Sequence, residues 1–237
     1  MKRFLMDKRN LIIVLLSILF IIKIPQGGVC FILWVLGGII IAAASDILIT
    51  RVLLRQKLIP KSAVISGFIV SGILDYHQPW FILAIFSILA ILSKHSIRFK
   101  GRHIFNPANF GLFTAALFGI PLTWSIESNI YIIIAVGIYI ACSIRKLPHV
   151  AGFLIFFTGL FATQGGNPFL LISWFFIFVM LIEPKTSGFG NLRGFIFGSI
   201  AGMASFLIYK FLPQYDFFVG SLFIANMFNP LLEKIKK

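Results

Sequence analysis

The chain has 237 residues, of which 59% are hydrophobic and only seven are Asp or Glu, and its mean hydropathy is +1.00. This composition excludes an ordinary soluble domain and predicts an integral membrane protein. The net charge of +14 is also typical of proteins that bind nucleic acid. The positions of the basic residues must therefore decide between the two classes.

Ten apolar runs follow one another along the chain, and no hydrophilic connection between them is long enough to fold by itself. Several runs are shorter than the ~20 residues that a straight helix needs to cross a bilayer. We predict an all-α protein in which residues 1–237 form one transmembrane domain, a bundle of about ten helices. The runs lie at residues 5–24, 29–49, 62–74, 79–93, 106–121, 129–144, 149–163, 168–182, 194–211 and 216–232.

The basic residues separate cleanly between the two sides of this bundle. Of the 21 Lys and Arg residues, 19 lie at the termini or in the connections that follow even-numbered runs, and only Lys23 and Lys210 lie in the others. Cytoplasmic connections of membrane proteins carry an excess of Lys and Arg. We therefore expect both termini in the cytoplasm and the lipid bilayer as a partner, and we do not expect a nucleic acid.

Two stretches of the sequence indicate an internal repeat. Residues 66–69 open a short run that ends before residues 78–81, and residues 151–154 open another that ends before residues 167–169. Each is followed by a longer apolar helix and then by a polar inner loop. Short segments interrupted by Gly and Pro at matching places of two halves indicate a membrane binding site. The alternative is chance similarity among segments rich in Phe, Gly and Leu.

Segment 101–111, Gly-Arg-His-Ile-Phe-Asn-Pro-Ala-Asn-Phe-Gly, is the strongest candidate for a site. It places two amides, a proline and basic residues where a cytoplasmic loop enters an apolar helix. Such groups are tolerated in hydrocarbon only against protein or a ligand. Of the four histidines, only His103 lies beside this segment and is a candidate. Cys30 and Cys142 belong to no ligand set, so neither a metal site nor a catalytic residue is expected.

Two acidic residues at predicted helix ends are candidates for an ion pathway, because an ionisable group at membrane depth is costly. Glu183 begins a loop that we expect on the same face as segment 101–111. Its alternative is pairing with Lys185 or Arg193. For Asp46, pairing with Arg51 or contact with headgroup water is the favoured alternative. Three further acids lie on the side of the bundle opposite the basic connections, and we expect them to be solvated: Asp75, Glu127 and Asp216.

Four blocks of residues, taken in order, resemble the RnfD/NqrB family of membrane subunits. These subunits belong to Rnf-type electron-transport complexes and to sodium-translocating NADH:quinone oxidoreductases. The resemblance covers about residues 45–233, and Glu183 stands where the family has Asp in an Asp-Pro-x-Thr/Ser loop. The blocks are residues 61–68 with Pro79 and Trp80; residues 105–108 with Gly111, Pro121 and Trp124; residues 180–187; and residues 194–202 with Asn226 and residues 230–233.

The resemblance implies a ten-helix bundle that carries flavin within a redox-driven ion pump in the plasma membrane of a prokaryote. Family members attach one flavin to a threonine, in a long segment after the equivalent of Trp124. This chain is a short, divergent example, because the insert is missing and no Gly-Ala-Thr occurs. Covalent FMN is not expected, whereas noncovalent FMN or riboflavin is, since amide, cation and hydroxyl groups suit such a ligand.

We therefore expect a non-catalytic or flavin-carrying membrane subunit that couples electron transfer to ion translocation, with other membrane subunits as partners. The alternatives are a stand-alone transporter or channel for a small solute, which includes a flavin, and a purely structural assembly subunit. The residues expected to bind the cofactor are His103, Asn106, Pro107, Asn109, Lys185, Thr186, Ser187 and Asn226, and those of the ion pathway are Glu183 and Asp46.

Overall fold

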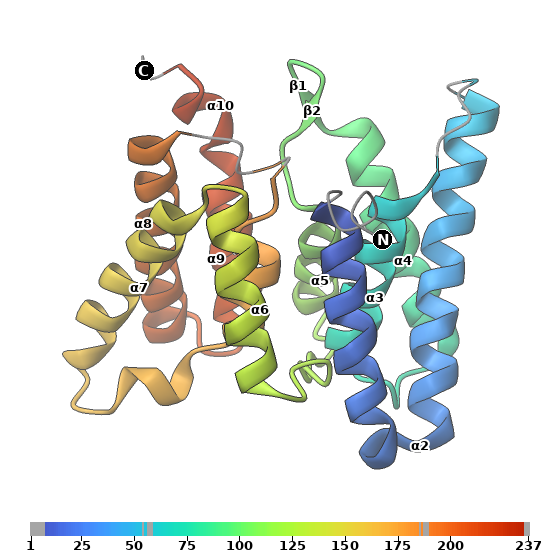
Figure 1. Cartoon of the computed structure of the whole chain (residues 1–237), viewed down its shortest axis with the longest axis horizontal. Coiled ribbons are helices and arrows are strands. Elements are labelled where there is room, and N and C mark those ends of the chain that lie inside the picture. Colours follow the sequence, from blue (N-terminus) through green and yellow to red (C-terminus); the bar gives the residue numbers. More distant parts are fainter. Residues whose placement is uncertain (1–7, 54, 56–58, 185, 187–189, 235–237) are drawn as a thin grey trace.

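The computed structural model describes residues 8–53, 55, 59–184, 186 and 190–234. Within these ranges the protein is all-α, apart from one two-stranded β-hairpin (Figure 1). In chain order the elements are α2 (Lys8–Leu48), η1 (Ile49–Leu53), α3 (Lys61–Ile73), α4 (Trp80–Ser96), β1 (Arg98–Phe99), β2 (Arg102–His103), α5 (Pro107–Leu117), α6 (Ile130–Ser143), α7 (Leu147–Ala162), η2 (Pro168–Leu171), η3 (Phe176–Leu181), α8 (Asn191–Phe211), α9 (Phe217–Met227) and α10 (Asn229–Leu232).

Helix α2 contains a reversal of direction at Gly28. This residue has φ 63° and ψ −163°, a conformation that glycine adopts without the steric cost of a side chain. Pro25, three residues earlier, has no N–H to donate to the helix. The arms before and after Gly28 run in opposite directions (Figure 1). Helix α2 thus supplies both of the first two predicted helices.

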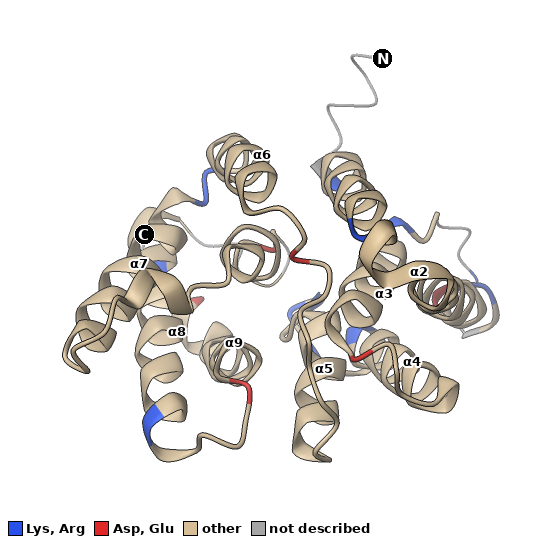
Figure 2. Ribbon diagram, turned by 90° about the horizontal axis from the view of Figure 1, so that it is seen from below, with Lys and Arg blue, Asp and Glu red and all other residues tan. Residues whose placement is uncertain are grey.

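The helices form two lobes, which are separate in the view along the bundle (Figure 2). In the first lobe α2 packs against α3 and α4, and α4 packs against α5; in the second, α7 packs against α8 and α8 against α9. Helix α8 approaches α7 closely because Gly198 has no side chain. A methyl group there would meet the backbone oxygen of His149 and the backbone nitrogen of Phe153. The lobes contact each other through α5 with α9 and α2 with α6.

The connection between α5 and α6, residues 118–129, is hydrogen-bonded to both lobes, and we call it the strap. Trp124 donates from Nε1 to Asp216, at the start of α9, and Glu127 accepts from the backbone of Trp174. Between them, the backbone N–H of Ile126 donates to Gly72 in α3, and the hydroxyl of Ser128 donates to Leu19 in α2. Neighbouring residues of the strap therefore hold opposite lobes.

One predicted helix is divided in the structure. Residues 168–182 were expected as a single run, but a 3-10 turn, η2, is followed by a separate helix that starts near Trp174. The hydroxyl of Ser173 accepts from the backbone N–H of Phe176, and Glu127 of the strap accepts from those of Trp174 and Phe175. These acceptors satisfy the exposed N–H groups of a new helix start. The long helix expected after Pro168 in the internal repeat is therefore absent from the described residues.

The structure instead relates α5 to α9. Each has 11 residues, and each starts with a side chain that accepts from a backbone N–H three residues later, Asn106 in α5 and Asp216 in α9. Leu-Phe-x-Ala occurs at residues 112–115 and again at residues 222–225. The two helices run in opposite directions (Figure 1), and the rings of Phe113 and Phe223 stack with centroids 3.9 Å apart.

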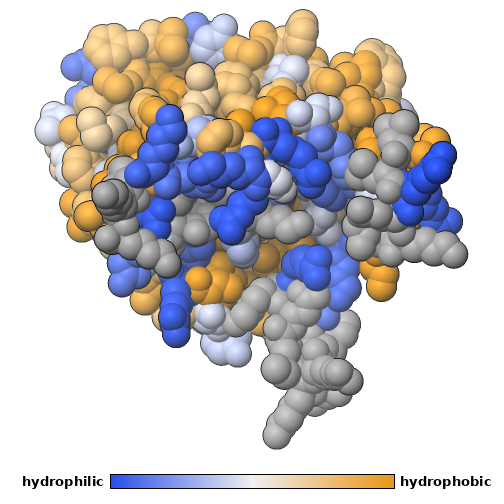
Figure 3. All heavy atoms as spheres, turned by 90° about the horizontal axis from the view of Figure 1, so that it is seen from above, coloured by the Kyte–Doolittle hydropathy of each residue, from blue (hydrophilic) through white to orange (hydrophobic). Residues whose placement is uncertain are grey.

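Charge divides the molecule into two ends. The hairpin end carries β1 and β2, the connection 144–146 and α10; the far end carries the Gly28 reversal, the strap and the connection 212–216 (Figure 1). Seen from above, hydrophilic side chains gather on the hairpin end and apolar side chains surround them (Figure 3). The basic residues Arg98, Lys100 and Arg102 of the hairpin are exposed at this end. Large apolar side chains such as Ile40, Tyr131 and Leu170 are exposed. The stretches Arg9–Val52 and Asn191–Phe211 are long and apolar enough to cross a membrane.

Candidate functional site

The β-hairpin at the hairpin end is formed by a two-residue turn. Phe99 pairs with Arg102, and the turn residues Lys100 and Gly101 have φ of 48° and 78°. Two positive φ angles are typical of the type I′ turn that joins twisted antiparallel strands. The hairpin exposes Arg98 and Lys100, while His103 is buried. The chain then passes from His103 directly to the start of α5.

The start of α5 is joined to the second lobe by two amides. Asn106 caps the helix, since its Oδ1 accepts from the backbone N–H of Asn109, and Pro107 occupies the first turn, where no N–H is needed. Asn106 Nδ2 donates to the carbonyl of Met180 over 3.3 Å, and Asn109 Nδ2 donates to that of Val219 over 3.0 Å. The amides predicted to be costly in hydrocarbon are thus used between the lobes.

A second pair of amides lies where α9 meets α10. Asn226 Oδ1 accepts from Asn229 Nδ2 over 3.2 Å, and the same Nδ2 donates to the carbonyl of Ile104 over 2.7 Å. Asn229 was missed by the sequence prediction. It precedes Pro230, so the Asn-Pro dipeptide of residues 106 and 107 occurs again here and was the available signal.

These four amides, Asn106, Asn109, Asn226 and Asn229, are buried, and we call them the amide seam. Within the described residues, three of their polar atoms have no hydrogen-bond partner: Asn109 Oδ1, Asn226 Nδ2 and Asn229 Oδ1. A buried polar atom without a partner costs about 1–3 kcal/mol. The seam therefore retains the capacity to bind a polar ligand or an ion.

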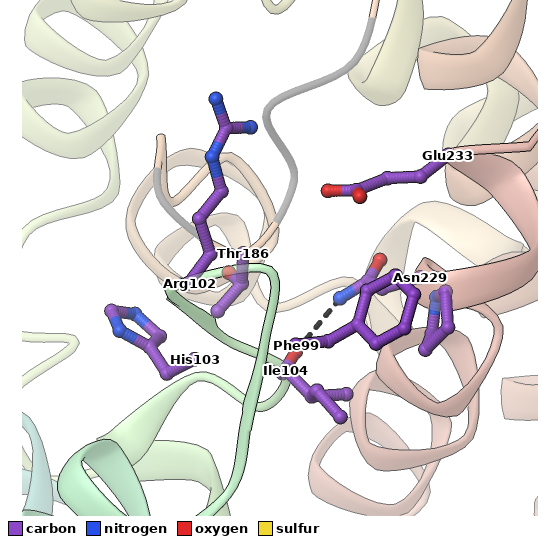
Figure 4. A pocket seen from close by; sticks show the side chains of 8 residues that line it. Phe99, Arg102, His103, Ile104, Thr186, Asn229 and Glu233 are labelled. Atoms are coloured by element: carbon purple, nitrogen blue, oxygen red, sulfur yellow. Dashed lines mark hydrogen bonds between the residues drawn. The ribbon is translucent and has the colours of Figure 1, made fainter.

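A small pocket opens beside the seam (Figure 4). Its volume is about 10 Å³, which is enough for about one water molecule. Asn229 directs its Nδ2 at the carbonyl of Ile104, as the dashed line marks, and its oxygen points away from that bond. Known small-molecule sites measure roughly 300 Å³ or more, so a flavin does not fit this pocket as it stands. The lining residues are Phe99, Arg102, His103, Ile104, Thr186, Asn229, Pro230 and Glu233.

The structure brings Glu183 to the hairpin. Its Oε1 lies 3.5 Å from His103 Nε2, and its Oε2 accepts from the hydroxyl of Thr186 over 3.0 Å. Lys146, in the connection between α6 and α7, belongs to the same group of charges: its pKa is lowered to about 7, chiefly by burial and also by the nearby Arg102, while Glu183 opposes the change. Lys146 Nζ also lies 3.2 Å from His149 Nε2. Sequence reasoning did not identify Lys146.

Asp46 lies in a different cluster, in the first lobe. Its Oδ1 is 2.8 Å from Lys94 Nζ and 2.7 Å from His95 Nε2, and Lys94 also donates to the hydroxyl of Ser62. Asp46 thus forms a buried ion pair with Lys94. Pairing with a basic residue was the alternative to a role in the ion pathway, but the partner expected from the sequence was Arg51. The structure does not place it with Glu183 or the amide seam.

Two acids at the far end differ from the expectation that they are solvated. Glu127 accepts from the hydroxyl of Ser173 and from two backbone N–H groups, and Asp216 accepts from Trp124 Nε1 over 2.7 Å and from the backbone N–H of Val219. Burial raises the pKa of both carboxyl groups, and these hydrogen bonds oppose it. For Asp75, burial raises the pKa, but hydrogen bonds from His77 outweigh it, so the pKa is lowered.

The predicted residues Lys185 and Ser187 lie outside the described residues. Across the ranges that are described, no group of three or more His, Cys, Asp or Glu residues is placed to hold a metal ion. No model of a known protein family matches the chain, and no curated protein matches it. The site must therefore be interpreted from its own chemistry.

Proposed function

We propose that this protein is a multi-pass membrane protein whose ten helical segments cross the bilayer, with the hairpin end and both termini in the cytoplasm. Three observations support the proposal: the helical segments follow the apolar runs, with the run 168–182 divided in two, the basic residues Arg98, Lys100 and Arg145 are exposed at the hairpin end, and large apolar side chains are exposed around the sides. Cytoplasmic connections are enriched in Lys and Arg. We place it in the plasma membrane of a prokaryote.

We further propose that the protein moves an ion through the interface between its lobes, as an RnfD/NqrB-like subunit of an electron-transport complex. The observation that carries this proposal is the amide seam. Its buried amides with unused polar atoms lie on α5 and α9, two short helices of opposite direction, and at the start of α10. Polar groups at such interrupted helices mark substrate and ion sites in membrane transporters. Glu183, beside His103 and Thr186, is the acidic group that we assign to the cytoplasmic entrance of this path.

In the proposed complex, the partner subunits carry the electrons. The resemblance to the RnfD/NqrB family implies FMN or riboflavin bound noncovalently. The pocket beside the amide seam, however, is far smaller than a flavin needs. We therefore assign no electron-transfer step to residues of this chain, and its contribution is the ion path.

The experiment uses inverted membrane vesicles that contain the protein with its native partners. Addition of the electron donor should drive ion uptake. In the Glu183→Gln variant, uptake should fall by about tenfold while electron transfer by the partners continues, because only the ion path has lost its charge. Asp75→Asn, a change of an acid at the far end, is the matched control and should leave uptake unchanged. Equal uptake in wild type and Glu183→Gln would reject the assigned ion path.

A stand-alone transporter for a small solute is the second candidate, and the relation between α5 and α9 favours it. Two short capped helices of opposite direction, with a shared Leu-Phe-x-Ala, are typical of transporters built from inverted repeats. The discriminating experiment reconstitutes the purified protein alone in liposomes. Solute flux without partners or electron donor would support this candidate over the electron-transport subunit.

A further inference from the structure

The far end contains a cavity that the proposed function does not use. Its volume is about 350 Å³, and it lies between the segment that follows α5 and the connection that precedes α9. These segments are at the opposite end of the same two helices that carry the amide seam (Figure 1). The lining residues are Ala116, Gly119, Ile120, Pro121, Leu122, Pro213, Gln214, Tyr215 and Asp216.

Among the described residues that line this cavity, Asp216 is the one that carries a charge. Its two oxygens accept hydrogen bonds from uncharged donors, Trp124 Nε1 and the backbone N–H of Val219. A carboxylate has about four acceptor positions, so these bonds leave capacity on Asp216. Among the described residues, no basic side chain forms an ion pair with it.

The bases of the far end are occupied elsewhere within the described part of the chain. Lys23 donates to Gln26, His77 pairs with Asp75, and Lys210 lies over the rings of Phe206 and Phe211. A carboxylate that is partly withdrawn from water without a cation is costly. Asp216 therefore offers an external cation a carboxylate that no basic side chain of the described residues pairs with.

The dimensions and walls of the cavity indicate the class of that cation. A volume of about 350 Å³ falls at the lower end of the range for small-molecule sites, roughly 300–1,000 Å³. Pro121 and Pro213 restrict the backbone of both walls, and Ile120 and Leu122 add apolar surface. A bare metal ion such as Ca²⁺ would need about six to eight oxygen ligands, whereas the described side chains of the lining offer one carboxylate, one amide and one hydroxyl, those of Asp216, Gln214 and Tyr215. An ammonium group on a small organic body matches the charge of Asp216 and a lining that is partly polar and partly apolar.

We propose that this cavity is a binding site for the ammonium group of a small organic cation, with Asp216 as the counter-ion. The ammonium group can come from a free amine or from the headgroup of a phospholipid, and the chemistry recognised is the same.

The probes are choline and tetramethylammonium, titrated by calorimetry into the full-length protein in a maltoside detergent, which carries no ammonium group. Both should bind saturably. Asp216→Asn keeps an acceptor for Trp124 and a good helix cap but removes the charge, so it should weaken binding by about tenfold or more. Gln214→Lys, at an exposed position, places an ammonium group of the protein beside Asp216. This group should occupy the carboxylate and abolish binding of both probes.

Glu127→Gln is the matched control, because it neutralises another partly buried acid of the far end that does not line the cavity. Its binding should equal that of wild type. Nanodiscs of phosphatidylcholine and of phosphatidylglycerol distinguish the sources: weaker choline binding in the former identifies a lipid headgroup as the occupant, and equal binding identifies a free amine. Absence of saturable binding, or equal binding by a folded Asp216→Asn protein, would overturn the proposal.

Discussion

Asn109 shows how one amide can be both structural and available to a ligand. Its Nδ2 bonds the carbonyl of Val219 across the lobes, while its Oδ1 has no partner within the described residues. The Asn-Pro dipeptide made this segment predictable, because it marks a capped helix start. The acceptor on α9 was not predictable, since 110 residues separate the two.

Asn109→Leu should lower the free energy of unfolding by about 1–3 kcal/mol, because it leaves the buried carbonyl of Val219 without its donor. Thermal unfolding in detergent measures the change. Asn167→Ala, which removes an exposed cap at η2, is the control and should cost less than about 1 kcal/mol. Equal losses in the two variants would contradict a structural role for the bond to Val219.

Lys146 should make stability depend on pH. Its pKa in the folded protein is lowered to about 7 from the ordinary 10.5, so the unfolded chain binds more protons between these values. The contribution of Lys146 to stability is therefore complete above about pH 10.5 and is lost as pH falls through about 7. Stability should rise between pH 7 and pH 10, and Lys146→Met should flatten this rise. An unchanged slope in that variant would assign the pH dependence to other groups.

At the scale of elements, most helix positions follow from the apolar runs and their Pro and Gly boundaries. The division of residues 168–182 does not, because the acceptor that allows a second helix start, Glu127, comes from the strap, more than 40 residues earlier. The buried pair of Asp46 with Lys94 was also hidden, since 48 residues separate its members. Local patterns cannot reveal partners that only tertiary packing brings together.

The packing of α7 on α8 supplies a prediction with a built-in comparison. Gly198→Ala should destabilise the protein, by about 1–3 kcal/mol or more, because the added methyl meets the backbone of α7. Gly159→Ala, in α7, has open space around the new methyl and should be neutral or stabilising, since alanine favours helices over glycine. Thermal unfolding of both variants provides the measurement, and a reversed order would exclude the close approach at Gly198.

At the scale of the whole molecule, the separation of basic residues along the sequence corresponds to the two ends of the structure. Arg98, Lys100 and Arg145 lie at the hairpin end, while Lys23 and Lys210 lie toward the far end. The separation of basic residues does not depend on the exact bounds of each helix. It depends on successive helices running in opposite directions, which short connections impose. The relation between α5 and α9 was missed, since its caps are an amide in one helix and a carboxylate in the other.

Thiol labelling tests the proposed orientation. In a background of Cys30→Ser and Cys142→Ser, Gln164→Cys places a thiol in an exposed connection of the far end, and Lys100→Cys places one at the tip of the hairpin. A membrane-impermeant maleimide should label position 164 in intact cells, and position 100 only after the cells are opened. The reverse pattern would invert the topology, and labelling of both positions in intact cells would refute a sealed membrane between them.

The strap has a mechanical consequence for a protein of two lobes. The side chains of Trp124 and Glu127 form hydrogen bonds with the second lobe, and Ile126 and Ser128 form hydrogen bonds with the first. These four residues alternate between the lobes and lie within a stretch of five residues. A rotation of one lobe against the other that preserves these bonds must have its axis near the strap, where displacements are smallest. The far end would then act as the pivot, and the largest opening would occur at the hairpin end. Such an opening has to break the bonds from Asn106 to Met180 and from Asn109 to Val219 in the amide seam.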